Sequence, residues 1–289
     1  MNTAKMSKIG LLIGNGRVVR KVWSSLSEQH TVIPVGLVPG AEAVLERYTR
    51  TFTIGQVAEI CDYLKSHGVN QIAFSGDLGL VKNQDEGELT KALIGISNVT
   101  DITIQRLLRS KAPVEEIVNR IGEILTEEGI QLKHVNEVVP DFRIGEGWIM
   151  PKENAVKADY CQHVEFVRDA LSGIRTERRN ALERSAIVFD GDTMVGPPDQ
   201  STDDLLESVE SVNKKAGQLR SFVKVSTAVG ETNLAAPVVG PETMELCHRA
   251  GIDIVILDSL NGLIVDIETC LDFCAENEIS VFGMSLHQS

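Results

Sequence analysis

The stretch KIGLLIGNG, residues 8–16, decides the fold of the first half of the chain. It is a short apolar run that ends in glycines, which is typical of a buried strand that leads into a turn. The following RVVRKVWSSLSEQH (17–30) carries apolar residues at helical spacing, and TVIPVGLV (31–38) resumes a strand-like apolar run. This order predicts a β-α-β unit.

The same alternation continues along the chain. VAEICDYLKSHG (57–68) predicts an amphipathic helix closed by Gly68, and QIAFSG (71–76) predicts the next strand. Residues 88–129 are mostly helical in pattern. Because strands alternate with helices, the N-terminal part is predicted to be an α/β domain with a parallel, doubly wound sheet.

The second half is also α/β in pattern, with a hairpin that makes its sheet mixed. SAIVFDGDTMVGP (185–197) predicts a hairpin across Gly191, and STDDLLESVESVNKKAG (201–217) predicts a helix that begins at Ser201 or Thr202. SFVKVST (221–227) then predicts a strand. The later segments predict, in order, a helix, two strands, a helix and a last strand: GPETMELCHRAGI, IVILD, GLIVD, IETCLDFCAENE and ISVFG.

Glycine and proline punctuate the segment VNEVVPDFRIGEGWIMP (135–151) between the two halves. A length of 289 residues fits two ordinary domains better than one. We therefore expect an N-terminal glycine-turn α/β domain over residues 1–150 and a C-terminal α/β domain over residues 151–289.

Composition and charge exclude several classes of protein. The chain has 28 basic and 41 acidic residues, so its formal charge of -13 would repel nucleic acid phosphates. No apolar run approaches the roughly 20 residues that span a bilayer, and we expect a cytoplasmic protein. The five cysteines have no paired spacing typical of a structural zinc site, so we expect them to be reduced thiols in the core.

Two glycine-bearing loops are candidates for an anion site in the N-terminal domain. Gly14, Asn15 and Gly16 follow the first strand and open a helix, where backbone N–H groups could hold a phosphate. Gly76 and Asp77 end a later strand, and in a parallel sheet the two loops would converge at a switch point. The alternative is that the glycines only form tight turns, because the third glycine of the dinucleotide fingerprint is missing.

The C-terminal half carries carboxylates in loops. Asp190, Asp203 and Glu231 are oxygen ligands of the kind that Mg²⁺ or Mn²⁺ binds, although aspartate at turns and helix starts is also favoured by capping alone. Lys224 interrupts an apolar strand, so it either extends to the rim of the sheet or binds an anion.

The run VKVSTAVGETNLAAPVVGPETMELCHRAGIDIVILDSLNGLIVD (223–266) resembles the UDP-2,3-diacylglucosamine pyrophosphatases of the LpxI type. The segments IGLLIGNG (9–16), FDGD (189–192) and QSTDDLLESV (200–209) stand in the order of that family. The resemblance covers nearly the whole chain, and it is strongest between Val223 and Asp266.

The resemblance implies a two-domain enzyme that binds a lipid-linked nucleotide sugar between its domains. Such an enzyme hydrolyses the pyrophosphate in lipid A synthesis with a divalent metal, Mg²⁺ or Mn²⁺, and releases UMP and the acylated sugar 1-phosphate. From these candidates and the resemblance together, we expect Glu231, Lys224 and Asp190 as catalytic residues, and Glu231, Asp190 and Asp203 as metal ligands. The substrate would be bound by two glycine turns and three polar side chains: Gly14, Asn15, Gly16, Gly76, Asp77, Thr202, Thr227 and Asn233.

The loop after Lys224 departs from the family pattern, which carries a second lysine, an arginine and a second acid. This chain has Thr227, Asn233 and Ala235 at those positions and keeps one acid as Glu231. Two functions therefore stay open: a hydrolase of the pyrophosphatase or phosphodiesterase type, and a repurposed homologue that binds a nucleotide or acylated ligand or acts on a different phosphorylated substrate. Peripheral contact with the inner membrane and a homodimer are further expectations.

Overall fold

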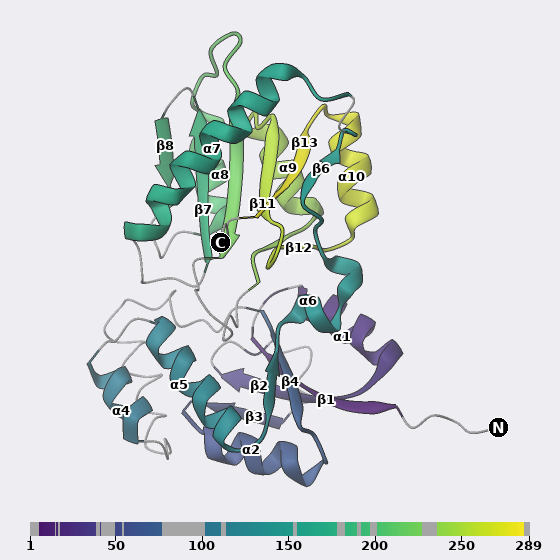
Figure 1. Cartoon of the computed structure of the whole chain (residues 1–289), viewed down its shortest axis with the longest axis vertical. Coiled ribbons are helices and arrows are strands. Elements are labelled where there is room, and N and C mark those ends of the chain that lie inside the picture. Colours follow the sequence, from purple (N-terminus) through teal and green to yellow (C-terminus); the bar gives the residue numbers. More distant parts are fainter. Residues whose placement is uncertain are drawn as a thin grey trace, which may run out of the picture. The chain divides into compact units, whose positions relative to one another are not determined.

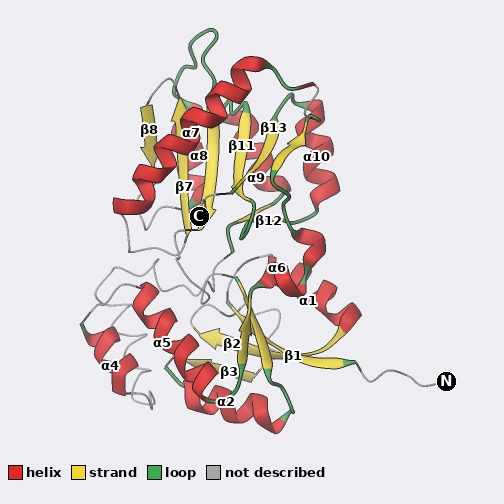
Figure 2. Ribbon diagram, in the orientation of Figure 1, coloured by secondary structure: helices red, strands yellow, loops and turns green. Residues whose placement is uncertain are grey.

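The computed structural model describes residues 6–14, 16, 18–38, 41, 50–53, 55–76, 102–110, 114–152, 155–177, 183–189, 192–196, 201–226 and 236–285. The chain divides into two compact units, whose described residues lie within 6–140 and within 141–285 (Figure 1). Each unit is a sheet with helices packed beside it, so the predicted two-domain α/β class is confirmed (Figure 2).

The N-terminal unit contains a five-stranded sheet in which all pairs of neighbouring strands are parallel. Its strands are β1 (Ser7–Ile13), β2 (His30–Val38), β3 (Arg50–Thr53), β4 (Gln71–Ser75) and β5 (Gln131–Lys133). Its helices are α1 (Val18–Gln29), α2 (Val57–Ser66), α4 (Ile102–Arg109), α5 (Val114–Glu127) and α6 (Val135–Val138). The predicted β-α-β unit is β1, α1 and β2, and Gly68 follows α2 with a φ of +72°, as its capping position requires.

In the strand order β3-β2-β1-β4-β5, β1 is the central strand, with β2 and β3 on one side and β4 and β5 on the other. The chain first adds β2 and β3 on one side of β1 and then crosses to add β4 on the other side. The switch point of this doubly wound sheet therefore lies between the carboxyl ends of β1 and β4, which is where ligands bind in open α/β sheets.

The C-terminal unit contains a six-stranded mixed sheet with the order β6-β13-β11-β9-β7-β8. Its strands are β6 (Gly147–Met150), β7 (Glu183–Phe189), β8 (Asp192–Val195), β9 (Arg220–Ser226), β11 (Ile254–Asp258) and β13 (Ser280–Met284). A separate parallel pair is formed by β10 (Val238–Val239) and β12 (Leu263–Ile264). The helices are α7 (Ala158–Glu177), α8 (Thr202–Glu210), α9 (Pro241–Arg249) and α10 (Ile267–Glu276), and a 3-10 turn spans Pro140–Phe142.

Helices cover both faces of the C-terminal sheet. One apolar cluster joins α8, α9 and α10 to the sheet through residues such as Leu206, Phe222 and Leu257. A second cluster joins α7 to the opposite face through residues such as Val164 and Val223. In Figure 1, α7 accordingly crosses in front of the sheet and α9 lies behind it.

Three sequence predictions differ in extent from the observed elements. The sequence predicts a boundary at residue 150, whereas the second unit begins at Asp141, because β6 pairs with β13. The helix predicted over 201–217 ends at Glu210, since the residues from Ser211 to Gly217 are exposed and have no apolar face to bury. The predicted strand GLIVD keeps only the two residues of β12 in a ladder.

The predicted hairpin is confirmed, because β7 and β8 pair antiparallel; its turn residue Gly191 lies outside the described residues. Within the described ranges, no helix is both long enough and apolar enough to cross a membrane.

Candidate functional site

The two glycine loops of the N-terminal unit meet at the switch point. Ile13 and Ser75 are paired in the β1/β4 register, and the Gly14 N–H donates a hydrogen bond of 2.9 Å to the Ser75 carbonyl oxygen. Gly16 and Gly76 have φ angles of +122° and +99°, a backbone conformation that glycine adopts without steric cost. The described parts of the two predicted loops therefore begin at neighbouring strand ends.

The Gly14 loop leads directly into α1. The Gly16 carbonyl oxygen accepts a hydrogen bond of 3.3 Å from the Val19 N–H in the first turn of the helix. Backbone N–H groups at such a turn, together with the helix dipole, favour an anion. Asn15 and Asp77, which the sequence also predicts for this site, lie outside the described residues.

In the C-terminal unit, Lys224 lies within β9 and is buried, with 7% of its surface exposed. Its ammonium Nζ donates a hydrogen bond of 3.1 Å to the carbonyl oxygen of Val238 in β10. Val238 stands three residues before Pro241, the first residue of α9. The lysine is therefore close to the segment that leads into α9.

Thr202 is brought to the same region through Ser185. Ser185 pairs with Lys224 across β7 and β9, so the two side chains lie on one face of the sheet. The hydroxyl groups of Ser185 and Thr202 are 3.1 Å apart. The lysine of β9 and the first residue of α8 thus both adjoin Ser185.

The start of α8 is fixed by a capping box. Ser201 accepts a hydrogen bond of 3.1 Å from the Asp204 N–H through its hydroxyl, while the Asp204 carboxylate accepts from the Ser201 N–H. Ser201 is therefore the N-cap, one of the two positions that the sequence predicts. Asp203, one of the three predicted metal ligands, is exposed in the first turn of this helix.

Asp258 is a buried carboxylate that sequence reasoning does not single out. It is 1% exposed at the carboxyl end of β11 and accepts hydrogen bonds from the backbone N–H groups of Ser226, Leu260 and Asn261 and from the Asn261 side chain. It therefore ties the last residue of β9 to the turn after β11. The acid that ends the apolar run IVILD is the signal that could have identified it.

The described residues do not form a metal site by themselves. Among them, no group of three or more His, Cys, Asp or Glu side chains could hold a metal ion. The carboxylate oxygens of Asp258 are already occupied by N–H donors. The other predicted residues of this site, Asp190, Thr227, Glu231 and Asn233, lie outside the described residues.

Comparison with known families identifies both halves of the chain. The family model of the LpxI N-terminal domain matches residues 8–142, and that of the LpxI C-terminal domain matches residues 185–282. No curated protein matches the chain. Because the two domain matches follow one another and together span most of its length, the chain belongs to the LpxI family, whose domains imply an enzyme of the lipid A pathway.

Proposed function

We propose that the chain hydrolyses the pyrophosphate of a UDP-diacylglucosamine-like nucleotide sugar and releases UMP and the acylated sugar 1-phosphate. The observation that carries the proposal is the buried Lys224, which shares one face of the sheet with Ser185 and the start of α8 in a chain that contains both LpxI domains. A cation held in a largely dry environment acts strongly on a phosphate group.

In this proposal Lys224 contacts a phosphate and stabilises the negative charge that develops when water attacks phosphorus. The oxygen of water forms a new bond to one phosphorus of the pyrophosphate and its proton is released, while the P–O bond from that phosphorus to the bridging oxygen breaks and the bridging oxygen leaves with the other phosphate. Gly14, Gly16 and Gly76 would bind an anionic group at the switch point of the N-terminal unit.

The proposed enzyme also uses a divalent metal. Bound Mg²⁺ or Mn²⁺ would neutralise the negative charge on the pyrophosphate oxygens. Asp203 alone, exposed at its helix start, does not make a site, so the metal depends on Asp190 and Glu231. We also propose a cytoplasmic enzyme that contacts the inner membrane peripherally, where a diacyl substrate would reside, and that forms a homodimer.

The experiment is incubation of the purified protein with UDP-2,3-diacylglucosamine and Mg²⁺ or Mn²⁺, followed by quantification of UMP. We expect UMP release that EDTA abolishes. Lys224→Met should lower kcat/KM about 100-fold, since removal of one charge-stabilising donor typically has an effect of this size. Lys215→Met, which changes an exposed lysine, is the matched control and should leave the rate unchanged.

A binding function is the second candidate. The sequence of the loop after Lys224 favours it, because Thr227, Asn233 and Ala235 stand where the family pattern has charged residues. It predicts that UMP or the nucleotide sugar raises the melting temperature without turnover, because a ligand that binds only the native state stabilises it. Native mass spectrometry of the gently purified protein, before and after addition of Mg²⁺, distinguishes the two functions. An intact nucleotide sugar that survives the metal would contradict hydrolysis.

A further inference from the structure

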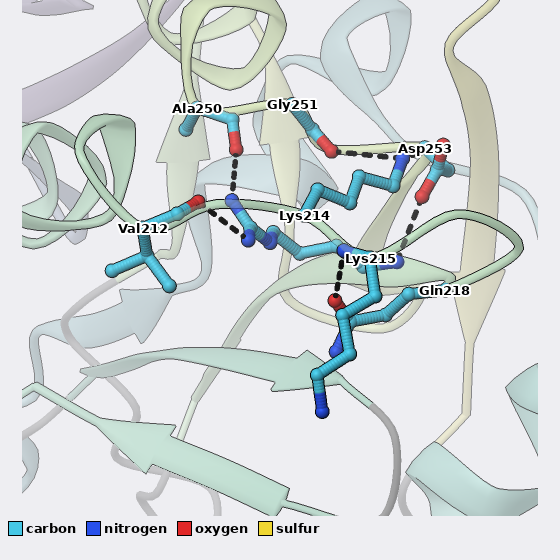
Figure 3. Close-up of polar contacts among 8 residues, drawn as sticks. Val212, Lys214, Lys215, Gln218, Ala250, Gly251 and Asp253 are labelled. Carbon is cyan, nitrogen blue, oxygen red and sulfur yellow. Dashed lines mark hydrogen bonds and ion pairs between the residues drawn. The ribbon is translucent and has the colours of Figure 1, made fainter.

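Arg220, the first residue of β9, places a guanidinium group inside the C-terminal unit. The residue is 2% exposed. Its Nη1 donates to the Ala250 carbonyl oxygen at 2.6 Å and to the Val209 carbonyl oxygen at 3.5 Å, and its Nη2 donates to the Val212 carbonyl oxygen at 3.0 Å. Figure 3 shows this fork of contacts to Ala250 and Val212.

These carbonyl groups belong to the carboxyl ends of two helices. Val209 lies in the last turn of α8, Val212 follows that helix, and Ala250 is the C-cap of α9. The carboxyl end of a helix carries partial negative charge and carbonyl groups without intrahelical partners. One buried guanidinium group therefore donates hydrogen bonds at the carboxyl ends of both helices.

A second set of contacts holds the backbone of Arg220 in place. The Arg220 N–H donates to the Asp253 carboxylate at 2.7 Å, and Lys214 pairs with the same carboxylate and donates to the Gly251 carbonyl oxygen (Figure 3). Burial lowers the pKa of the Arg220 guanidinium below its ordinary value, and the negative charge of Asp253 opposes this change. Arginine nevertheless keeps its charge at neutral pH.

The opposite ends of both helices lie near Lys224. Thr202, at the start of α8, contacts Ser185, which pairs with Lys224 in the sheet. Val238, which accepts from Lys224, lies just before the start of α9. A nine-residue helix is about 13.5 Å long, and the four residues from Arg220 to Lys224 span about 13 Å of strand. Each helix thus reaches from one side chain of β9 to the other.

We propose that Arg220 is a positioning residue that sets the starts of α8 and α9 against Lys224 by fixing the other ends of these helices. The expected fall in rate rests on the proposed function. The expected displacement of the helix starts rests on the geometry of β9, α8 and α9. A tilt of about 5° at one end of such a helix moves its other end by about 1 Å. Misplacement by about 1 Å at a catalytic site can lower a rate about 100-fold.

The test compares Arg220→Met with Lys215→Met, which alters an exposed lysine in the loop between α8 and β9. Hydrogen exchange is followed at the first-turn amides of Leu205 and Met244, which bond to Ser201 and Gly240. In Arg220→Met we expect at least 10-fold faster exchange at these distant amides, with unchanged exchange in the centres of β11 and β13. We also expect kcat to fall at least 10-fold with KM within about twofold. Lys215→Met should change neither property.

Faster exchange confined to the carboxyl ends of α8 and α9, or an unchanged kcat in a folded Arg220→Met protein, would overturn the proposal. If this variant does not fold, Arg220→Lys retains the charge without the planar fork and is judged by the same two measurements. If the unaltered protein forms no UMP, the proposed function fails, and the exchange at Leu205 and Met244 still decides whether Arg220 positions the helices.

Discussion

The backbone N–H of Gly14 donates a hydrogen bond of 2.9 Å to the carbonyl oxygen of Ser75, and this bond joins the ends of β1 and β4. The two strands are neighbours although α1, β2, β3 and α2 separate them in sequence. Because the sheet changes its direction of growth between them, the bond marks the edge where a ligand of the N-terminal unit is expected.

Gly16→Ala tests whether this edge depends on the glycine backbone. A β-carbon at Gly16 would meet no atom closer than 4.0 Å, so the cost comes from its φ of +122° alone. We expect a loss of about 1–3 kcal/mol in the free energy of unfolding by urea and about 10-fold weaker binding of UMP by calorimetry, because the turn that presents the anion site would shift. Gly145→Ala, whose added carbon meets nothing within 4 Å, is the control. Equal affinities for UMP in the two variants would show that the Gly14 loop is not part of the binding site.

Gly283→Ala tests the close approach of two backbone segments in the C-terminal unit. A β-carbon at this position in β13 would lie 1.8 Å from the Gly145 carbonyl oxygen, so the backbone itself would have to move. We expect a loss of about 3 kcal/mol or more in unfolding free energy. At Gly240 the nearest atom to an added carbon is 4.0 Å away and the backbone is extended, so Gly240→Ala should cost at most about 1 kcal/mol. Similar losses in the two variants would contradict the observed packing.

Sequence pattern predicted those elements whose cause is local. The apolar run and glycines of residues 8–16 produce β1 and its turn, and the Ser201 hydroxyl caps α8 as its residue type favours. The strands β3 and β10 were not predicted, because they are short and their ladders depend on neighbours distant in sequence. Their side-chain pattern does not distinguish them from loops.

The residues of the candidate site also differ in whether the sequence pattern reveals them. Lys224 is conspicuous because it interrupts an apolar strand, and the glycine loops are conspicuous because they end strands. Ser185 and Arg220 give no such signal, since serine and arginine near the ends of strands are ordinary surface residues in most proteins. Their roles arise from the register of β7 against β9 and from the carbonyl groups that α8 and α9 direct at Arg220.

Asp258→Ala tests the carboxylate that joins β9 to the turn after β11. Its removal leaves the N–H groups of Ser226, Leu260 and Asn261 without this acceptor. We expect a loss of about 3 kcal/mol in unfolding free energy, because hydrogen bonds to a buried carboxylate are strong and Asp258 accepts several of them. Asp203→Ala, at the exposed first turn of α8, should cost about 0.5 kcal/mol. A comparable cost at both positions in urea denaturation would show that Asp258 does not link the two segments.

The thiols provide a prediction on pH dependence. The expectation that all five thiols lie in the core is wrong for Cys161, which is exposed, whereas Cys61, Cys247, Cys270 and Cys274 are buried. Burial raises the pKa of Cys61 and of Cys274 to about 11 and that of Cys270 to about 12, from 9.0. A thiol reagent at pH 8 should therefore titrate one cysteine in the native protein and all five in denaturant.

Because the folded-state pKa values of these buried thiols are raised, the contribution of the thiols to stability is complete below pH 9 and is lost as the pH rises towards 11 to 12. The unfolding free energy should thus decline above pH 9, equally in the Cys161→Ser control, whose native protein should show no reactive thiol. Rapid reaction of a second cysteine at pH 8 in the native protein would contradict the buried thiol positions.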